Sequence, residues 1–435
     1  MHKNILRIAL PSIMSNITVP LLALADTAIV GHLGRTAFIG AIAVGGLLFN
    51  MTYWLCGFLR MGTGGLTAQA FGAGNRDEAY RILMQAAVVA GTLAGLFVLL
   101  QRPVCDVAFR FMDATPEVEH YARRYFFVLI WGAPAVLGQY VLTGWFLGMQ
   151  DARTPMYVAV SQNVVNVCAS LFLVFVLGWK VEGVAAGTLA AQYFGLAVAL
   201  RVWRKRYRPA RMPAFRDSMT RTALGRFFRV NRDIFLRTLC LVTTTTVFTA
   251  TGAEQGDGIL AANALLMQMF LLFSYVMDGF AYAGEALGGR CSGAADNAGF
   301  RQTVRGLFAW GGGLALLFTA VYALCGTALL GLLTDRDEVV RLAAAYLPYA
   351  AVIPLTSFAA FLLDGIYIGT TSTKAMLGAM AAATAAFLLA LHTLRPLAGN
   401  HALWVAFLLY LGLRGAIQLA VLPKVMRGIG RRADG

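Results

Sequence analysis

Charged residues are scarce in this chain of 435 residues. Only 13% of its residues are Asp, Glu, Lys or Arg, whereas soluble proteins contain about a quarter. Hydrophobic residues make up 59%, and the mean hydropathy is +0.67. This composition excludes an ordinary soluble protein and indicates a polytopic membrane protein. The net charge of +15 would suit nucleic acid, but the basic residues lie between apolar runs, as the positive-inside bias predicts. We therefore expect no nucleic-acid partner.

Patterns that mark enzymes and metal sites are also missing. The six cysteines are scattered without disulfide or metal-ligand spacing, and the five histidines form no constellation with them. The chain lacks the HExxH, Walker A, dinucleotide-binding and GxSxG signatures. An ATP-driven pump would need a nucleotide site, and a lipid-modifying enzyme would need clustered acids or histidines at one membrane face. We expect no catalytic residue, no metal and no cofactor, and hence a transporter driven by an ion gradient.

Apolar runs long enough to cross a membrane are abundant, since a span needs about 20 residues. Twelve can be drawn, at 8–31, 38–71, 80–100, 124–149, 156–179, 183–204, 233–252, 259–289, 303–333, 341–369, 375–394 and 401–425. When alternate loops are assigned to opposite sides, one side holds 24 of the 36 Lys and Arg residues and the other holds 9. That asymmetry predicts a multi-pass protein with both termini in the cytoplasm.

A basic segment at the middle of the chain, residues 205–232, separates the runs into two groups of six. We interpret it as a cytoplasmic linker between an N-terminal lobe, 1–204, and a C-terminal lobe, 233–435. The halves are related in sequence: GNRDEA at 74–79 matches GAADNA at 293–298 with an offset of 219 residues, and Gly144, Gly148 and Arg153 match Gly365, Gly369 and Lys374 with an offset of 221. An even repeat predicts two pseudo-symmetric six-helix lobes related by an axis along the membrane normal. This architecture disfavours an ion channel.

Asp26 is the only charged residue in the apolar stretch 8–31. A carboxylate at the centre of a membrane helix costs about 2.5–3.5 kcal/mol on insertion scales, so it normally faces a cavity or a partner. Such a group can bind a proton or cation in one state and release it in another, or it can be a structural carboxylate that caps free backbone groups.

Three motifs resemble the multidrug and toxic compound extrusion (MATE) family, in its DinF-like branch. They are PLLALADTAIVGHLG at 20–34, FLRMGTGGLTAQAFGAGN at 58–75 and LLDGIYIGTTST at 362–373. The resemblance spans all twelve runs. It implies an all-α, V-shaped transporter of the inner (plasma) membrane that exports bulky, often cationic organic compounds against a proton or sodium gradient. We expect a monomer.

The resemblance also implies a coupling site in the first lobe. Asp26 matches the family's first-helix carboxylate, Asn166 and Thr188 match members of its polar cluster, and Asn163 lies one turn before Asn166. Relatives often carry a second aspartate where this chain has Ser170. Because a sodium ion needs several oxygen ligands and compensating charge, Ser170 favours proton over sodium coupling. For the asparagines and Thr188 the alternative role is hydrogen bonding between helices.

Other charges in the spans are Arg60, Asp278, Glu285 and Asp364. At the 219-residue offset Arg60 is equivalent to Gly279, next to Asp278, and an Arg60–Asp278 ion pair could gate the cleft between the lobes. A permanent packing contact, or an Arg60 side chain that reaches the cytoplasmic face, is an equal alternative. Asp364 could titrate in the second lobe.

Aromatic and Met side chains suit a cavity for bulky cations. The candidates for the substrate cavity are Tyr53, Trp54, Tyr140, Met267 and Phe280. The alternative function is a flippase of lipid-linked precursors, which should line its cavity with several arginines or lysines. Only Arg60, Arg237 and Arg414 lie inside spans, which favours the exporter.

Overall fold

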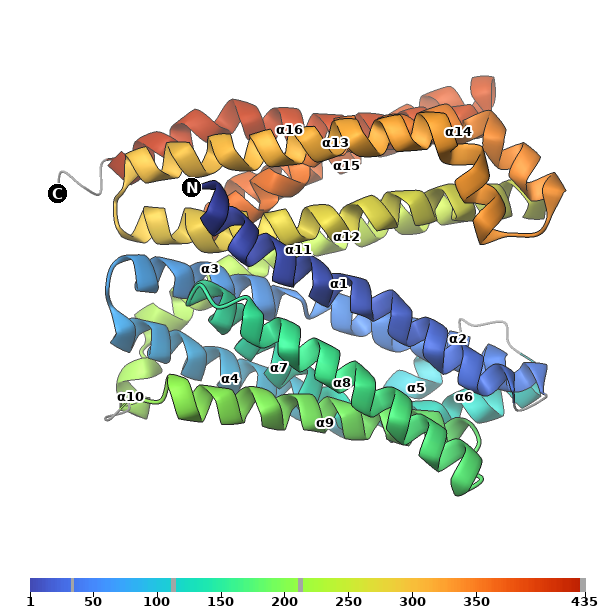
Figure 1. The fold of residues 1–435 in the computed structure, drawn as a ribbon, viewed down its shortest axis with the longest axis horizontal. Helices are drawn as coiled ribbons and strands as arrows, with labels where there is room; N and C mark the ends of the chain where they lie inside the picture. The colour runs from blue at the N-terminus through green and yellow to red at the C-terminus, as the bar shows by residue number, and fades with distance from the viewer. Residues whose placement is uncertain (33–34, 111–114, 210–213, 431–435) are drawn as a thin grey trace. The chain divides into compact units, whose positions relative to one another are not determined.

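The computed structural model describes residues 1–32, 35–110, 115–209 and 214–430. Within these ranges the chain forms sixteen α-helices, one 3-10 turn and one π-helical turn, and no strand (Figure 1). Twelve helical segments of the described chain are long and apolar enough to cross a membrane, from His2–Gly31 to Asn400–Ile429. The prediction of an all-α protein with twelve membrane-spanning helices is confirmed.

The helices cluster into two compact units, each described here by itself. The N unit comprises Met14–Thr67 and Asn75–Phe228, and the C unit comprises Met1–Ile13, Ala68–Gly74 and the chain from Arg229 onward. The lobe boundaries at 204 and 233 and the role of 205–232 as a linker stay predictions. Helix α9 ends at Arg206, a short helix α10 follows at Phe215–Ser218, and α11 begins at Arg221. Residues 210–213 of the predicted linker lie outside the described residues.

Most helices of the N unit come from the first half of the chain. They are most of α1 (His2–Gly31), α2 (Thr36–Leu55), the first part of α3 (Phe58–Gly72), α4 (Arg76–Leu99), α5 (Gln101–Arg110), α6 (Pro116–Leu129), the 3-10 turn η1 (Ile130–Gly132), α7 (Ala133–Gly148), α8 (Arg153–Leu171), the π turn η2 (Phe172–Val176) and α9 (Val181–Arg206). Side-chain caps determine where two of them start. Asn75 accepts a hydrogen bond from the backbone N–H of Glu78 at 3.0 Å, and Thr115 precedes a proline in the first turn of α6.

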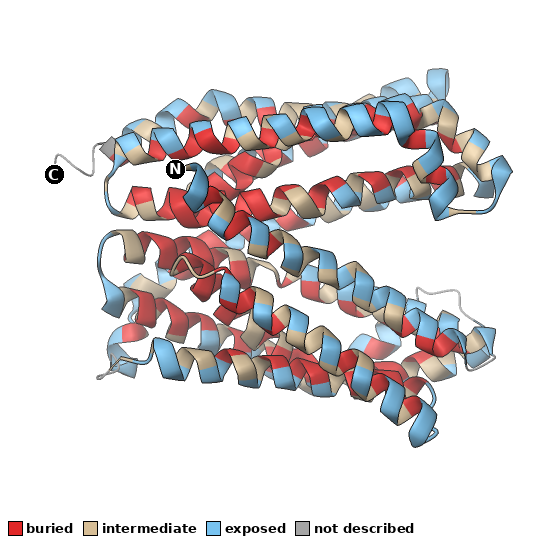
Figure 2. Ribbon diagram, viewed as in Figure 1, coloured by how far each residue is buried: buried red, intermediate tan, exposed pale blue. Residues whose placement is uncertain are grey.

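The C unit is built around α11 (Arg221–Ala253), α12 (Asp257–Gly293), α13 (Asn297–Leu333), α14 (Asp337–Gly369), α15 (Thr373–Ala398) and α16 (Asn400–Gly430). Buried residues concentrate along α12 and the second half of α14 (Figure 2). Toward the other end of this unit, Phe248, Trp404 and Phe407 pack ring against ring in its apolar core. Aromatic pairs of this kind prefer such edge-to-face arrangements.

The repeat is visible in the backbone and has a constant offset of 221 residues. Gln150 and Thr371, at the same place in their units, both have positive φ, at 66° and 53°. Gly74 and Ala295 are a second such pair, with φ of 69° and 54°. The next residues, Asn75 and Asp296, each cap a helix by accepting a hydrogen bond from the N–H three residues later. The 219-residue alignment of GNRDEA with GAADNA was therefore wrong by two positions, because matching letters carried less information than the turn geometry.

Close helix packing repeats at the same offset. A Cβ on Gly144 would overlap the carbonyl oxygen of Arg60, and a Cβ on Gly365 would overlap that of Ala281. Small residues let membrane helices approach closely enough for such backbone contacts. Arg60 is thus equivalent to Ala281 and not to Gly279, as the sequence alignment had placed it. The glycines fix α7 on α3 within the N unit and α14 on α12 within the C unit.

Candidate functional site

Asp26 lies on α1 and is buried, with 8% of its surface exposed. Its Oδ1 atom has no hydrogen-bond partner, and no ion pair to this residue exists among the described residues. Burial without a partner is costly for a charged carboxylate. The group can therefore exchange its charge for a proton without breaking an interaction within the N unit.

The asparagines of α8 connect it to both neighbouring helices. Asn163 donates from Nδ2 to the carbonyl oxygen of Thr18 on α1, at 3.1 Å. Asn166 donates from Nδ2 to Oγ1 of Thr188 on α9, at 2.8 Å. These bonds bring together residues that the sequence placed in one polar cluster. Asp26 shares no hydrogen bond with them in the described chain.

Two further oxygen atoms of this region lack a partner in the part of the chain that the structure describes. They are Oδ1 of Asn166, which is 1% exposed, and Oγ of Ser170, which is fully buried. Ser170 lies where α9 packs closest on α8, since a Cβ on Gly187 would overlap its side chain. The crowding explains why a small residue occupies this position. Together with Asp26, the N unit holds three buried oxygen atoms that can accept a proton, a hydrogen bond or a cation.

Tyrosines of four helices surround the same region. Tyr125 on α6 is close enough to Asp26 to interact with it electrostatically, and Tyr53 on α2 interacts in the same way with Tyr125, Tyr140 and Tyr193. The Tyr53 side chain is buried, and its hydroxyl has no hydrogen-bond partner among the described residues. The predicted cavity residues Tyr53 and Tyr140 are thus neighbours.

The remaining cavity candidates lie in different surroundings. Trp54 on α2 is 43% exposed. Met267 on α12 packs against the aromatic core of the C unit, and Phe280 is 2% exposed and stacks on Trp310. Their role in binding substrate stays a prediction.

A groove of about 350 Å³ runs between α1 and α8 in the N unit. Thr18 and Asn163 form its polar part, and Leu21, Val164 and Val167 form much of its apolar part. The hydrogen bond from Asn163 to Thr18 closes one side of this groove. A change in the position of α1 against α8 would therefore have to break that bond.

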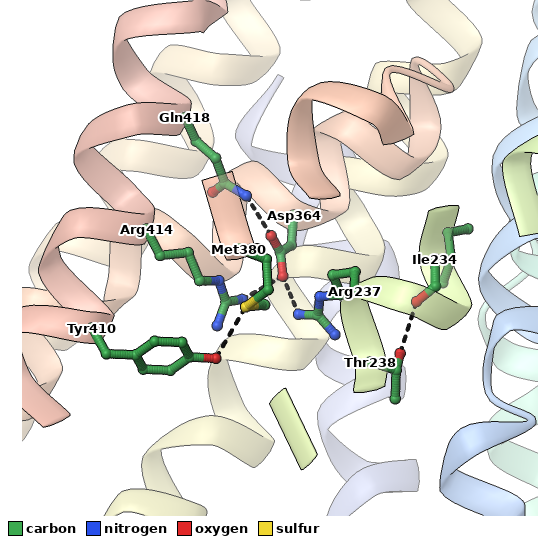
Figure 3. Close-up of polar contacts among 8 residues, drawn as sticks. All are labelled: Ile234, Arg237, Thr238, Asp364, Met380, Tyr410, Arg414 and Gln418. Atoms are coloured by element: carbon green, nitrogen blue, oxygen red, sulfur yellow. Dashed lines mark hydrogen bonds and ion pairs between the residues drawn. The ribbon is translucent and has the colours of Figure 1, made fainter. Parts of the chain in front are cut away.

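Asp364 is the centre of a second polar cluster, in the C unit (Figure 3). Its Oδ2 accepts hydrogen bonds from the guanidinium groups of Arg237 on α11 and Arg414 on α16. Its Oδ1 accepts a hydrogen bond from Nε2 of Gln418, one turn further along α16, at 2.6 Å. The side chains of Asp364 and Arg414 are only 7% and 2% exposed. Both carboxylate oxygens are therefore occupied, in contrast to those of Asp26.

Sequence reasoning named Asp364 but missed its partners. Arg237 and Arg414 were noted only as charges inside spans. A signal was present: three isolated charges in one half of the chain each needed compensation at membrane depth. The sequence did not show that α11, α14 and α16 meet at one point.

The other predicted charges are also buried or half-buried. Arg60 on α3 is 9% exposed, and Glu285 on α12 is 1% exposed. Asp278, on α12, is half-buried and close enough to Arg414 to interact with its charge. Arg60 belongs to the N unit and Asp278 to the C unit, and an ion pair between them stays a prediction.

Comparison with known proteins gives a consistent result. The MatE family model matches residues 11–172 and 234–392. The chain is 40% identical over 423 residues to DNA damage-inducible protein F of Escherichia coli, covering 96% of this chain and 91% of that protein. It is 24% identical over 427 residues to the chloroplastic protein DETOXIFICATION 44 of Arabidopsis thaliana, covering 94% and 80%.

Solved structures share the fold. The Vibrio cholerae MATE transporter VcmN in its bent form superposes with a TM-score of 0.86 at 19% identity, covering 98% of this chain and 97% of that one. A MOP superfamily transporter from Pyrococcus furiosus superposes with a TM-score of 0.89 at 18% identity, covering 98% and 96%.

These matches identify a helical membrane transporter, not an enzyme. The chain belongs to the MATE family, and its nearly full-length similarity to the E. coli protein supports the predicted DinF-like branch. Members of this family are multi-pass membrane proteins that handle small molecules and are coupled to cations.

Proposed function

We propose that this protein is a proton-coupled antiporter that exports bulky, often cationic organic compounds from the cytoplasm. The observation that carries this proposal is the unpartnered Asp26 on a membrane-length helix. A carboxylate that must alternate between charged and neutral forms cannot be held in one form by fixed partners. Asp26 meets this requirement within the N unit.

Asp364 does not meet it. Two guanidinium groups and one amide donate to its two oxygens, so a proton on Asp364 would leave buried cations without their counterion. We assign Asp364 to a permanent structural pairing in the C unit. Proton exchange in the transport cycle is assigned to Asp26.

Proton coupling is favoured over sodium by the chemistry of the oxygens near the α8–α9 contact. A sodium ion requires several oxygen ligands and compensating negative charge. Asn166 and Ser170 offer only neutral oxygens, and Asp26 is the only carboxylate of the proposed site. A proton needs a single titratable group, which Asp26 supplies.

The substrate class follows from the same charge. A cation bound near ionised Asp26 is stabilised by it, and the tyrosines Tyr53 and Tyr140 offer aromatic faces that attract cations. A proton that enters from outside neutralises Asp26 and weakens that binding. Linkage makes the effect reciprocal, because the bound cation must lower the affinity for the proton by the same factor.

Helix α1 is the proposed moving element. Pro11 and Pro20 each remove one backbone hydrogen bond from this helix, which makes bending there less costly. The bond from Asn163 to Thr18 would break and reform as α1 shifts against α8. The charge bias of the loops further supports placement in the inner membrane with both termini cytoplasmic, and we propose that the monomer is the transporting form.

The alternative of a flippase for lipid-linked precursors has less support. A cavity for large anionic head groups needs free cations within the membrane. In the C unit, Arg237 and Arg414 are both bound to Asp364 and are not available for this purpose.

The test is efflux from proteoliposomes under separately imposed proton and sodium gradients, with a fluorescent monovalent cation as substrate. A proton gradient alone should drive export, and Asp26→Asn should insert normally but lose gradient-driven export. Asp278→Asn serves as a matched control on another acid within a span. Full proton-driven export by Asp26→Asn, or export driven only by sodium, would contradict the proposal.

A further inference from the structure

A cavity of about 670 Å³ lies at one end of the C unit, where α14 connects to α15 and α16 ends. Its walls carry the cationic side chains of Arg229, Lys374 and Lys424. Within the described ranges none of these three side chains has an ion-pair or hydrogen-bond partner. All the lining residues are at span ends on the membrane face shared with the N-terminus, which the charge bias predicts to be cytoplasmic.

The buried part of the cavity carries unused hydrogen-bond donors. Ser292, near the end of α12, lines the cavity and is 3% exposed, and its hydroxyl has no partner in the described part of the chain. The first turn of α15 also opens on the cavity, and the preceding residue, Ser372, makes no side-chain cap. Backbone N–H groups at such a helix start have no partner within the helix. The cavity thus combines three free cations with a buried hydroxyl.

The internal repeat shows what occupies the same position in the N unit. There Asp151, equivalent to Ser372 at the 221-residue offset, places a carboxylate at the start of α8. Its Oδ1 accepts hydrogen bonds from the backbone N–H groups of Arg153 at 3.2 Å and Thr154 at 3.1 Å. Its Oδ2 accepts one from the hydroxyl of Tyr207 at 2.8 Å. The N unit therefore fills this position with an anion of its own.

In the C unit both the anion and the ring are replaced. Ser372 stands in place of Asp151, and Gly428, which lines the cavity, stands in place of Tyr207. The exchange removes one negative charge and one aromatic ring from the same place. An empty space with a positive lining is the result.

We propose that this cavity binds the phosphate group of an anionic phospholipid. Lys374, Lys424 and Arg229 supply the positive charge, and the start of α15 and Ser292 supply hydrogen-bond donors. The only acidic residue in the described lining is Asp233, and its carboxylate is already bound by Arg232 at 2.9 Å and by Thr373 at 3.0 Å. The lining therefore keeps a net positive charge.

A lipid is favoured over a soluble phosphate by the remaining wall. Val421, Val425 and Ile429, on the last turns of α16, line the cavity beside the cations. A free phosphate ion gains nothing from such a wall, whereas the glycerol and first acyl carbons of a lipid can pack on it. The position at the span ends also matches the depth of a headgroup, and anionic lipids concentrate in the cytoplasmic leaflet.

The test measures binding of phosphatidylglycerol to the full-length protein in neutral detergent by native mass spectrometry. Lys374→Gln/Lys424→Gln removes two exposed cations of the cavity, and Arg301→Gln/Arg305→Gln removes two exposed cations of α13 outside it. The first double variant should bind the lipid about tenfold more weakly, since each cation near an anionic headgroup contributes on the order of 1 kcal/mol. The second should bind like the unmodified protein.

Ser372→Asp provides a second, fold-preserving variant. It restores the carboxylate that the N unit carries and should block lipid binding while maintaining thermal stability. Inorganic phosphate is then added as a competitor: displacement of the lipid only at high concentration supports the lipid headgroup, and tight binding of phosphate itself supports the same site with a soluble phosphate ligand. Equal loss of lipid in both double variants, or unchanged binding in Ser372→Asp, would overturn the proposal.

Discussion

The two buried aspartates should respond in opposite ways to the same substitution, because only one has partners. Asp364 accepts hydrogen bonds from Arg237, Arg414 and Gln418. Asp364→Asn removes the charge and leaves Arg414, 2% exposed, without its counterion. Removal of one member of a buried ion pair costs about 3–5 kcal/mol. Hydrogen bonds to charged groups contribute about 1.5–3 kcal/mol each, so the upper half of that range is expected for two guanidinium groups.

Asp26→Asn should change stability by less than about 1 kcal/mol, because Oδ1 of Asp26 has no partner to lose and an amide is less costly to bury than a charge. The assay is thermal and denaturant unfolding of both variants in the same detergent, monitored by tryptophan fluorescence. The double variant Asp364→Asn/Arg414→Gln should recover part of the loss, since it removes one of the two buried cations left without a partner. If Asp364→Asn unfolds with the unmodified protein, or if Asp26→Asn is destabilised as much, the distinction between the two carboxylates is wrong.

Three further outcomes are expected. Ser170→Asp should increase sodium-stimulated transport, because it adds a carboxylate beside the free oxygen of Asn166, and no change in sodium dependence would remove this explanation of proton preference. Binding of a monovalent cationic drug, measured by equilibrium dialysis, should weaken on acidification as Asp26 takes up a proton; a pH dependence that survives in Asp26→Asn would place the coupling group elsewhere. Gly365→Ala should destabilise the protein by about 1–3 kcal/mol because its Cβ overlaps the carbonyl of Ala281, whereas Gly412→Ala, with open space around it, should not; equal thermal stability would refute the close contact.

Composition and periodicity alone determined the twelve spans, the helical class and the importance of Asp26. The physical reason is that a bilayer imposes its constraint locally. Each span must be apolar over about 20 residues, and a single carboxylate in such a run is conspicuous without knowledge of its neighbours. The same local constraint made the family motifs legible over the full chain.

Only the tertiary structure decided which buried charges are free. Asp26 and Asp364 look alike in sequence, each a lone carboxylate in an apolar run, yet three side chains from α11 and α16 occupy Asp364 and none occupies Asp26 within the described chain. Pairing depends on helices far apart in the sequence, and no local pattern records it. The repeat offset shows the same limit in another form. The letters of GNRDEA suggested 219 residues, and the caps of Asn75 and Asp296 fixed it at 221, because a turn is defined by backbone geometry that different residues can satisfy.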